Sequence, residues 1–124
     1  MNLNNISMYP IQRNRRLRSS ESIRSLIREN VLTPNDFIVP LFVVEGKNLR
    51  ESIPSMPGYT RISLDLLAGE VKSLWQLGLK AVLVFVKVPD HLKDNKGKEA
   101  LNKDGLMQRS VKTIKDAVPE MVVM

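Results

Sequence analysis

The 124-residue sequence contains no cysteine, and histidine occurs only once, as His91. The lack of cysteine excludes disulfides, thiolate metal sites and cysteine nucleophiles within these residues. No apolar run approaches the ~18–20 residues of a membrane-spanning helix, and the N-terminus lacks the apolar core of a secretory signal. We therefore expect a cytoplasmic protein without a membrane partner.

Glycine is also scarce, with six residues in the chain. Their spacing never gives GxGxxG or GxxxxGK[ST], so the sequence carries no phosphate-binding fingerprint. What remains is ordinary globular composition, with 43% apolar and 26% charged residues. A chain of this length can bury one hydrophobic core.

The net charge of +6 is concentrated near the N-terminus. Residues 1–30 hold six arginines and two glutamates, while residues 31–124 are nearly balanced. A nucleic-acid binder would need a basic face with interleaved aromatic residues, and this segment offers only Tyr9. A solvated or subunit-contacting arm is the favoured interpretation, and nucleic-acid binding is the alternative.

Strand-like and helix-like segments alternate after an arm at residues 1–18. A helix can begin at Ser19–Glu21, with an apolar stripe of Ile23, Leu26 and Ile27, and end near Asn30. The apolar runs 37–44 and 81–88 lack polar alternation, which predicts strands buried on both faces. Pro40 removes one ladder donor, so that part of its strand is expected to be irregular or unpaired.

Two longer helices are predicted between the strands, at residues 63–77 and 106–117. The second is expected to bury one face, formed by Met107, Val111, Ile114 and Val118. The connection 45–62 is interpreted as a loop with a turn at Pro57-Gly58, and the charged segment 90–105 as a mobile loop. Residues 121–124 open a third apolar strand.

This alternation predicts an α/β fold with a parallel sheet and right-handed crossovers. Three strands that are buried on both faces need helices on both sides of the sheet, and two crossover helices with one leading helix are too few for this. We therefore expect residues 19–124 to be the N-terminal part of a (β/α)8 barrel of about 250 residues, preceded by the arm 1–18 and cut off at its C-terminus. The alternative is a small self-contained domain with three strands.

Few residues suggest chemistry by themselves. Asp90 and His91 follow a strand end, where barrel active sites lie, but one histidine beside one acid is more simply an exposed loop start. Lys87 could be a desolvated Schiff-base amine, or it could point outward between barrel and helix and reach water. The lysines of the loop are interleaved with acids, which favours a solvated lid (Lys93, Lys96, Lys98 and Lys103).

Several segments form a recognisable set, in which the PLFV strand followed by the SMPG turn is the most specific part. They are Arg13–Arg18, Asp36–Val43, Glu45-Gly46, Ile53–Gly58, Leu77–Val82 and Lys112–Lys115. Together they resemble the N-terminal part of the porphobilinogen synthase family, also called delta-aminolevulinic acid dehydratase, and the resemblance runs from about residue 9 to the end.

The resemblance implies a TIM barrel of tetrapyrrole (haem) biosynthesis, in which two 5-aminolevulinate molecules condense to porphobilinogen. It also implies two Schiff-base lysines, a zinc or magnesium ion, and a homo-oligomer, usually an octamer, whose arm wraps a neighbouring subunit. The family's catalytic lysines and metal ligands would lie beyond Met124, so no catalytic or metal-binding position is assigned here. Arg13, Arg15, Arg16 and Arg18 are expected to be subunit-contact residues.

Two functional hypotheses follow from this resemblance. The first is a lyase that is active only within the intact family enzyme, so that these residues alone bind no metal and are inactive. The second is a non-catalytic assembly module that docks on full-length subunits through its basic arm.

Overall fold

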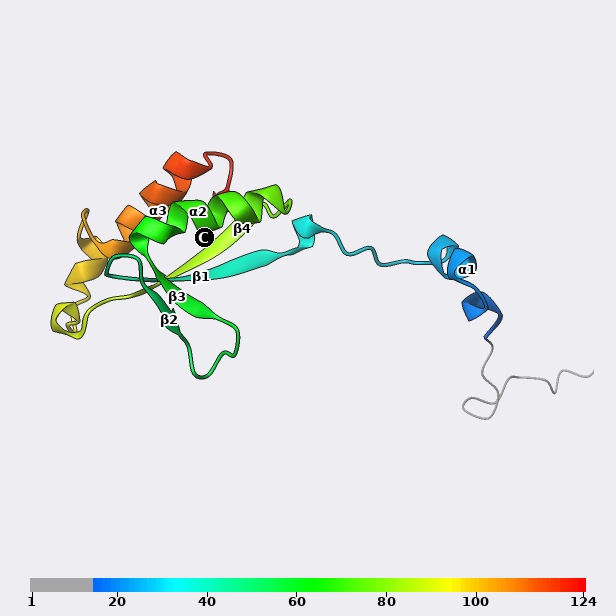
Figure 1. Cartoon of the computed structure of the whole chain (residues 1–124), viewed down its shortest axis with the longest axis horizontal. Helices are drawn as coiled ribbons and strands as arrows, with labels where there is room; N and C mark the ends of the chain where they lie inside the picture. The colour runs from blue at the N-terminus through cyan, green and yellow to red at the C-terminus, as the bar shows by residue number, and fades with distance from the viewer. Residues whose placement is uncertain (1–14) are drawn as a thin grey trace, which may run out of the picture. The chain divides into compact units, whose positions relative to one another are not determined.

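The computed structural model describes residues 15–124 and divides into two units, Met1–Leu32 and Thr33–Met124. The described part of the first unit holds a 3-10 helix, η1 (Arg16–Arg18), and a short helix, α1 (Glu21–Leu26) (Figure 1). Within residues 15–124, no helix is both long and apolar enough to cross a bilayer.

The second unit is built on a five-stranded sheet with strand order β2-β3-β1-β4-β5. β1 pairs in parallel with β3 and β4, and β4 with β5, while β2 and β3 form an antiparallel hairpin. The elements in chain order are η2 (Pro34–Asp36), β1 (Ile38–Val44), β2 (Arg50–Ser52), β3 (Thr60–Ser63), α2 (Leu64–Gln76), β4 (Ala81–Lys87), η3 (Asp90–Leu92), η4 (Lys98–Leu101), α3 (Leu106–Ala117) and β5 (Val122–Val123).

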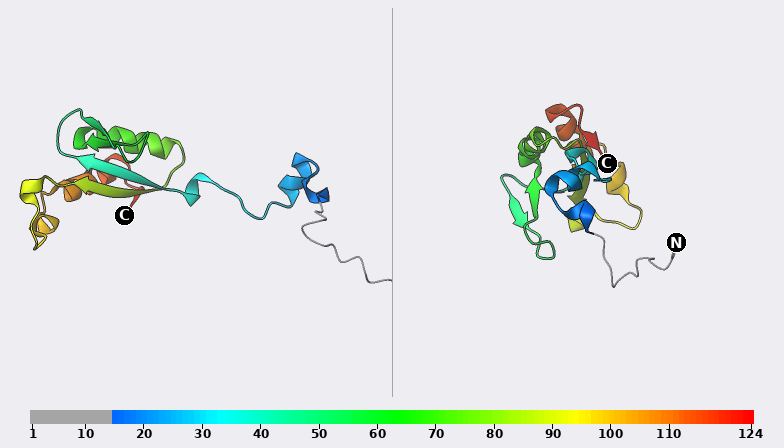
Figure 2. Two further views of the ribbon diagram at one scale, coloured as in Figure 1. Left: turned by 90° about the horizontal axis from the view of Figure 1, so that it is seen from below. Right: turned by 90° about the vertical axis from the view of Figure 1, so that its right-hand side faces the viewer.

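The predicted alternation of strands and helices is confirmed, and α2 and α3 lie together over one face of the sheet (Figures 1 and 2). That face holds the core, where alternate residues of β1 and β4 meet Leu67 and Val71 of α2 and Ile114 of α3. Met121, which precedes β5, is fully buried in the same cluster.

The expectation that both faces of the strands are buried is wrong for this structure. In β1, Leu41 and Val43 are buried, whereas Ile38 is 53% exposed; in β4, Val84 is buried and Phe85 is 45% exposed. The helices cover a single face, and strand residues alternate between faces, so every second apolar side chain lies on the uncovered face.

The connection 45–62 is not the loop that the sequence predicted, because it contains the hairpin of β2 and β3. Its turn is correct, since Gly58 adopts φ +82°, a left-handed conformation that favours glycine. Within β1, the residues that pair with β3 are Phe42–Val44. The half of β1 that holds Pro40 is therefore paired with β4 alone. The expected irregularity is not found, because Pro40 lies in regular register with Leu83 of β4.

The longer helices lie where they were predicted. Gly78, at φ +91°, follows the end of α2 as expected for a helix-terminating glycine. The buried face of α3 agrees in part with the predicted one: Ile114 and Val118 are buried as expected, whereas Met107 is 36% exposed and Leu106 and Ser110 are buried instead. Packing against α2 and β4 selects the observed face. The spacing of apolar residues alone did not distinguish it from the predicted face.

Helix α1 is shorter than predicted and ends at Leu26 rather than near Asn30. Its start is correct, because the Ser20 hydroxyl accepts a hydrogen bond from Ile23 N, as an N-cap does. Its apolar stripe is mostly exposed, with Leu26 85% and Ile27 44% exposed. A helix this short gains little from propagation, which explains the early end.

Candidate functional site at the carboxyl ends of the strands

A cavity of about 540 Å³ lies at the carboxyl ends of β1 and β4, where open parallel sheets place their ligands. Its lining comes from the ends of these strands, from β3 and from the segment 92–100. It comprises Phe42, Val43, Arg61, Phe85, Val86, Lys87, Val88, Leu92, Lys93, Asp94, Gly97, Glu99 and Ala100.

Aromatic rings on the uncovered face of the sheet form an apolar wall of this cavity. Phe42 and Phe85 are register partners on adjacent strands, and their rings stack with centroids 5.3 Å apart and an interplanar angle of 17°. Tyr59 meets Phe42 edge-on at 6.1 Å. Such stacked surfaces suit the aliphatic part of a small ligand.

Charged groups flank the rings. Glu51 of β2 accepts hydrogen bonds from Arg61 Nη1 at 3.3 Å and from Lys87 Nζ at 3.2 Å, both at Oε1. The side chains of these residues are between 26% and 52% exposed. They form a partly buried cluster with two cations and one carboxylate, which we call the Glu51 cluster (Glu51, Arg61 and Lys87).

The segment 90–105 was predicted to be a mobile loop, and the structure gives it two 3-10 turns, η3 and η4. Asp94 Oδ1 accepts from the backbone N–H of Lys96 and Lys98, at 2.9 and 3.1 Å. The Lys93 ammonium lies 2.6 Å from Asp90, and this hydrogen bond and charge lower the pKa of the Asp90 carboxyl. Local bonds of this kind explain how so polar a segment folds.

Two contacts of Arg109 connect the end of the segment 90–105 with the carboxyl end of β1. The Arg109 guanidinium pairs with Glu45, which directly follows β1, and Arg109 Nε also donates to Asp104 O at 2.9 Å. One arginine of α3 thus joins the loop before its own helix to the carboxyl end of the central strand.

A buried serine fixes the turn that follows β1. Ser63, which is fully buried, accepts from Leu49 N at 2.9 Å and donates to Asp65 Oδ1 at 2.5 Å. Asp65 Oδ2 accepts from Asn48 N at 2.8 Å. Ser63 and Asp65 therefore satisfy two backbone donors of a turn in which Asn48 adopts φ +51°.

Ser63→Ala will lower the free energy of unfolding by about 1–3 kcal/mol, because Leu49 N–H loses its acceptor in a partly buried place. Urea denaturation measures the change. Ser73→Ala is the matched control: Ser73 is exposed on α2, and its loss will change stability by less than about 0.5 kcal/mol. Equal effects of the two substitutions would show that Ser63 does not support the turn.

Asp65→Asn will reduce the loss of stability in acid. The pKa of Asp65 lies below its ordinary value because Ser63 Oγ–H and Asn48 N–H donate to the carboxylate. A lowered folded pKa adds stability above the unfolded pKa of about 3.9, and this is lost as the pH falls through the folded pKa. Urea unfolding between about pH 6 and pH 2 should give a shallower decline for the variant, and parallel curves would contradict the assignment.

The residues that sequence reasoning singled out are only partly in this cavity. Lys87 and Lys93 line it, whereas His91 and Asp90 are exposed in η3. Lys87 is neither desolvated nor between sheet and helices: its side chain is 52% exposed and pairs with Glu51 on the uncovered face. Sequence reasoning missed Glu51 and Arg61, although the alternation on either side of the Pro57-Gly58 turn could have indicated a hairpin.

Comparison with known proteins gives a consistent result. The model of the family described as "Delta-aminolevulinic acid dehydratase" matches residues 11–124. The chain belongs to the delta-aminolevulinic acid dehydratase family. The dehydratase of Bacillus subtilis is 45% identical over 111 residues, which are 90% of this chain and 34% of that protein. The dehydratase of Synechococcus elongatus is 40% identical over 116 residues, or 94% and 35% of the two chains.

A solved dehydratase has the same fold over this region. The structure of delta-aminolevulinic acid dehydratase (porphobilinogen synthase) from Toxoplasma gondii, in complex with the reaction product porphobilinogen, superposes with a TM-score of 0.84 at 39% identity. The match covers 94% of this chain and 33% of that one. The chain therefore spans about one third of the length of these dehydratases.

The family's metal does not fit the part of the chain that the structure describes. Over residues 15–124, no three side chains of the His, Cys, Asp and Glu type gather in one place, and the sequence has no cysteine. Residues 15–124 provide strands, a cavity wall and charged side chains.

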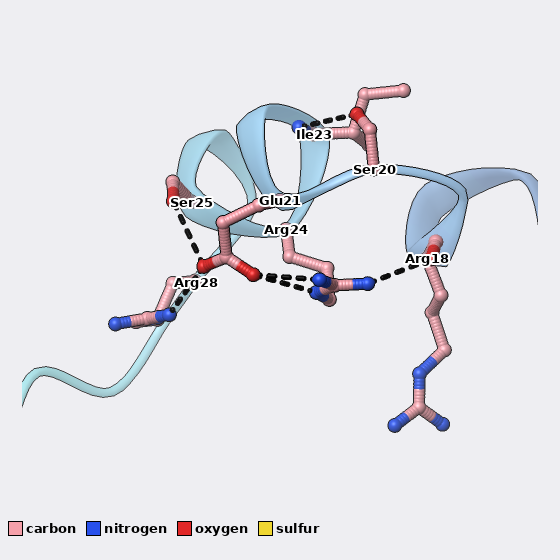
Figure 3. A network of polar contacts seen from close by, with 7 residues as sticks. All are labelled: Arg18, Ser20, Glu21, Ile23, Arg24, Ser25 and Arg28. Carbon is pink, nitrogen blue, oxygen red and sulfur yellow. Dashed lines mark hydrogen bonds and ion pairs between the residues drawn. The ribbon is translucent and has the colours of Figure 1, made fainter.

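The arm's arginines belong to the first unit. Arg13 lies outside the described residues, so its prediction is not tested here. Arg15, Arg16 and Arg18 are exposed. Glu21 pairs with Arg24 at 2.6 Å and with Arg28 at 3.3 Å, while Arg24 also donates to Arg18 O (Figure 3). These internal pairs leave the three more N-terminal arginines on the surface of the unit.

Proposed function

We propose that this chain supplies the N-terminal third of a porphobilinogen synthase, a lyase that condenses two 5-aminolevulinate molecules, with loss of two waters, in haem biosynthesis. The observation that carries the proposal is the family match over residues 11–124. The cavity at the carboxyl ends of β1 and β4 is in the place where barrel enzymes bind substrate.

The proposed setting of the chain is a (β/α)8 barrel, of which residues 19–124 are the first part. The parallel order β1-β4-β5 and the position of both long helices on one face support this, because a barrel keeps its helices outside. The uncovered face with Phe42 and Phe85 would then face the barrel interior.

Within that reaction, the chain's own residues bind and shield substrate rather than form covalent intermediates. The Phe42–Phe85 pair offers an apolar wall that excludes water, and the Glu51 cluster offers charge at its edge. A Schiff-base lysine supplies the electrophilic iminium in this chemistry, and a zinc or magnesium ion is the family's metal. No step is assigned to Lys87 or to a metal on these residues.

The arm residues Arg13, Arg15, Arg16 and Arg18 are proposed to contact a neighbouring subunit of a homo-oligomer in the cytoplasm. The exposed arginines and the uncovered stripe of α1 support a role in assembly rather than in the core. A second candidate function rests on the same observation: the chain could dock on full-length subunits as a non-catalytic module.

A segment exchange tests the proposed function. Residues 11–124 replace the matching segment of the Bacillus subtilis dehydratase, and purified chimaera is given 5-aminolevulinate. Formation of porphobilinogen is expected, because the relatives share 45% identity over this segment. A soluble, assembled chimaera without activity would contradict the proposal, and docking of the separate chain on the intact enzyme would favour the module.

A further inference from the structure

The segment 90–105 forms one wall of the cavity but has little apolar packing of its own. Residues 90–104 are exposed, apart from the partly buried Glu99. Six residues of the segment line the cavity (Leu92, Lys93, Asp94, Gly97, Glu99 and Ala100). A second cavity, of about 220 Å³, lies between η4, the end of β4 and the start of α3. The segment therefore projects beyond β4 with open space on its inner side (Figures 1 and 2).

Two side chains of α3 hold this segment to the rest of the fold. Gln108 Nε2 donates to Ala100 O at 3.0 Å. Arg109 Nε donates to Asp104 O at 2.9 Å. In the described part of the chain, no other side chain from outside the segment forms a hydrogen bond with it, and bonds such as those that Asp94 accepts are internal. Internal bonds keep the segment folded but do not fasten it to the sheet, so it can move as a unit.

Arg109 also joins this segment to the central strand, because its guanidinium pairs with Glu45 directly after β1. We propose that the segment 90–105 is a movable wall of the cavity, and that the Arg109–Glu45 pair sets how often this wall opens. The planar guanidinium donates to both partners at once, through Nε to Asp104 O and through Nη2 to Glu45. Loss of Glu45 would release the group that orients Arg109 toward the segment.

The second anchor is incompletely satisfied in the closed position, which is the one seen in this structure. Gln108 Oε1 is buried and has no hydrogen-bond partner among the described residues. A buried acceptor without a donor costs free energy, and water can satisfy it once the wall moves away. The closed position therefore carries a penalty that opening relieves, so opening is expected as a local event separate from unfolding of the sheet.

The Arg109–Glu45 pair is suited to adjust this equilibrium by a modest factor. The two side chains are 40% and 43% exposed, and ion pairs of such exposure contribute little and are weakened by salt. Opening would take Leu92 and Ala100 out of the cavity wall and widen the access to Phe85. The pair would thus control entry to the cavity without touching a ligand.

The experiment measures the position of the wall in the 124-residue chain by pulsed electron paramagnetic resonance. The chain has no cysteine, so Leu101→Cys in η4 and Ser73→Cys on α2 provide the only two sites for nitroxide labels. Leu101 is 84% exposed and Ser73 is exposed, so neither label disturbs the core. The distance between the labels reports closed and open positions as separate populations.

Glu45→Ala is expected to raise the ratio of open to closed wall by about two- to fivefold, as for loss of an exposed ion pair. Arg109→Ala removes both contacts and should raise the ratio by about tenfold or more. The double variant should match Arg109→Ala, because Glu45 acts through Arg109. Glu70→Ala is the matched control: it breaks the exposed Arg50–Glu70 pair, which lies outside the wall, and should leave the ratio unchanged.

Salt provides a second measurement that does not depend on a substitution at Arg109. Raising sodium chloride from about 0.02 to 0.5 M should move the chain with its native pair toward the ratio of Glu45→Ala, and should change Glu45→Ala little. Far-ultraviolet dichroism checks that each variant is folded. A general loss of stability would broaden the distances in Glu70→Ala as well.

A single, unchanged distance in all variants would overturn the inference, and so would equal effects of Glu45→Ala and Glu70→Ala. Additive effects in the double variant would show that Glu45 does not act through Arg109, which also contradicts it. None of these measurements depends on formation of porphobilinogen. An inactive chimaera would therefore overturn the proposed function and leave the movable wall in place, and an active chimaera with a fixed wall would do the reverse.

Discussion

Given 5-aminolevulinate alone, the 124-residue chain will form no porphobilinogen. The condensation needs an amine that attacks a ketone, and the lysines of the cavity wall, Lys87 and Lys93, are both more than half exposed and paired with carboxylates. An exposed amine in such a pair lacks the desolvated pocket that activates a lysine nucleophile. The described residues also bring together no metal-ligating cluster.

Colour development with Ehrlich's reagent measures the product, and the Bacillus subtilis dehydratase under the same conditions is the positive control. Product above the blank from the purified chain would contradict this prediction and would reopen a catalytic role for Lys87. Lys87→Gln would then decide the matter, since loss of that product would assign the amine and retention would exclude it.

The sequence predicted the elements best where one physical signal was sufficient. Runs of β-branched residues located β1 and β4, and the helical spacing between Ser63 and Gly78 located α2. The hairpin was missed because β2 and β3 are short and polar on one face. Their strand form depends on pairing with each other and with β1, which the short alternation around the Pro57-Gly58 turn indicates only weakly.

The candidate site depended still more on tertiary contacts. Lys87 was visible as a lysine at a strand end, but its partner Glu51 lies 36 positions away in the sequence. Arg61 could be recognised as a residue of the candidate site only from the sheet register, which places it beside Phe42. The sequence indicated that the helices are too few to cover the strands on both faces, but an apolar run does not say which of its residues the helices will cover.

Leu67→Ala will be among the most destabilising single substitutions in the chain. Leu67 is fully buried in α2, within the core cluster that joins both long helices to the sheet. Removing its side chain loses transfer free energy and leaves a cavity, with a cost of about 2–5 kcal/mol. Against a total stability of about 5–15 kcal/mol, this is enough to unfold a large fraction of a marginal domain.

Leu77→Ala provides the control with the same chemical change at the end of the same helix. Leu77 is 70% exposed, so its loss removes little buried surface and should alter the free energy of unfolding by about 0.5 kcal/mol or less. Urea denaturation followed by far-ultraviolet dichroism compares the two. A difference of less than about 1 kcal/mol between them would mean that α2 does not pack on the sheet in solution as it does in this structure.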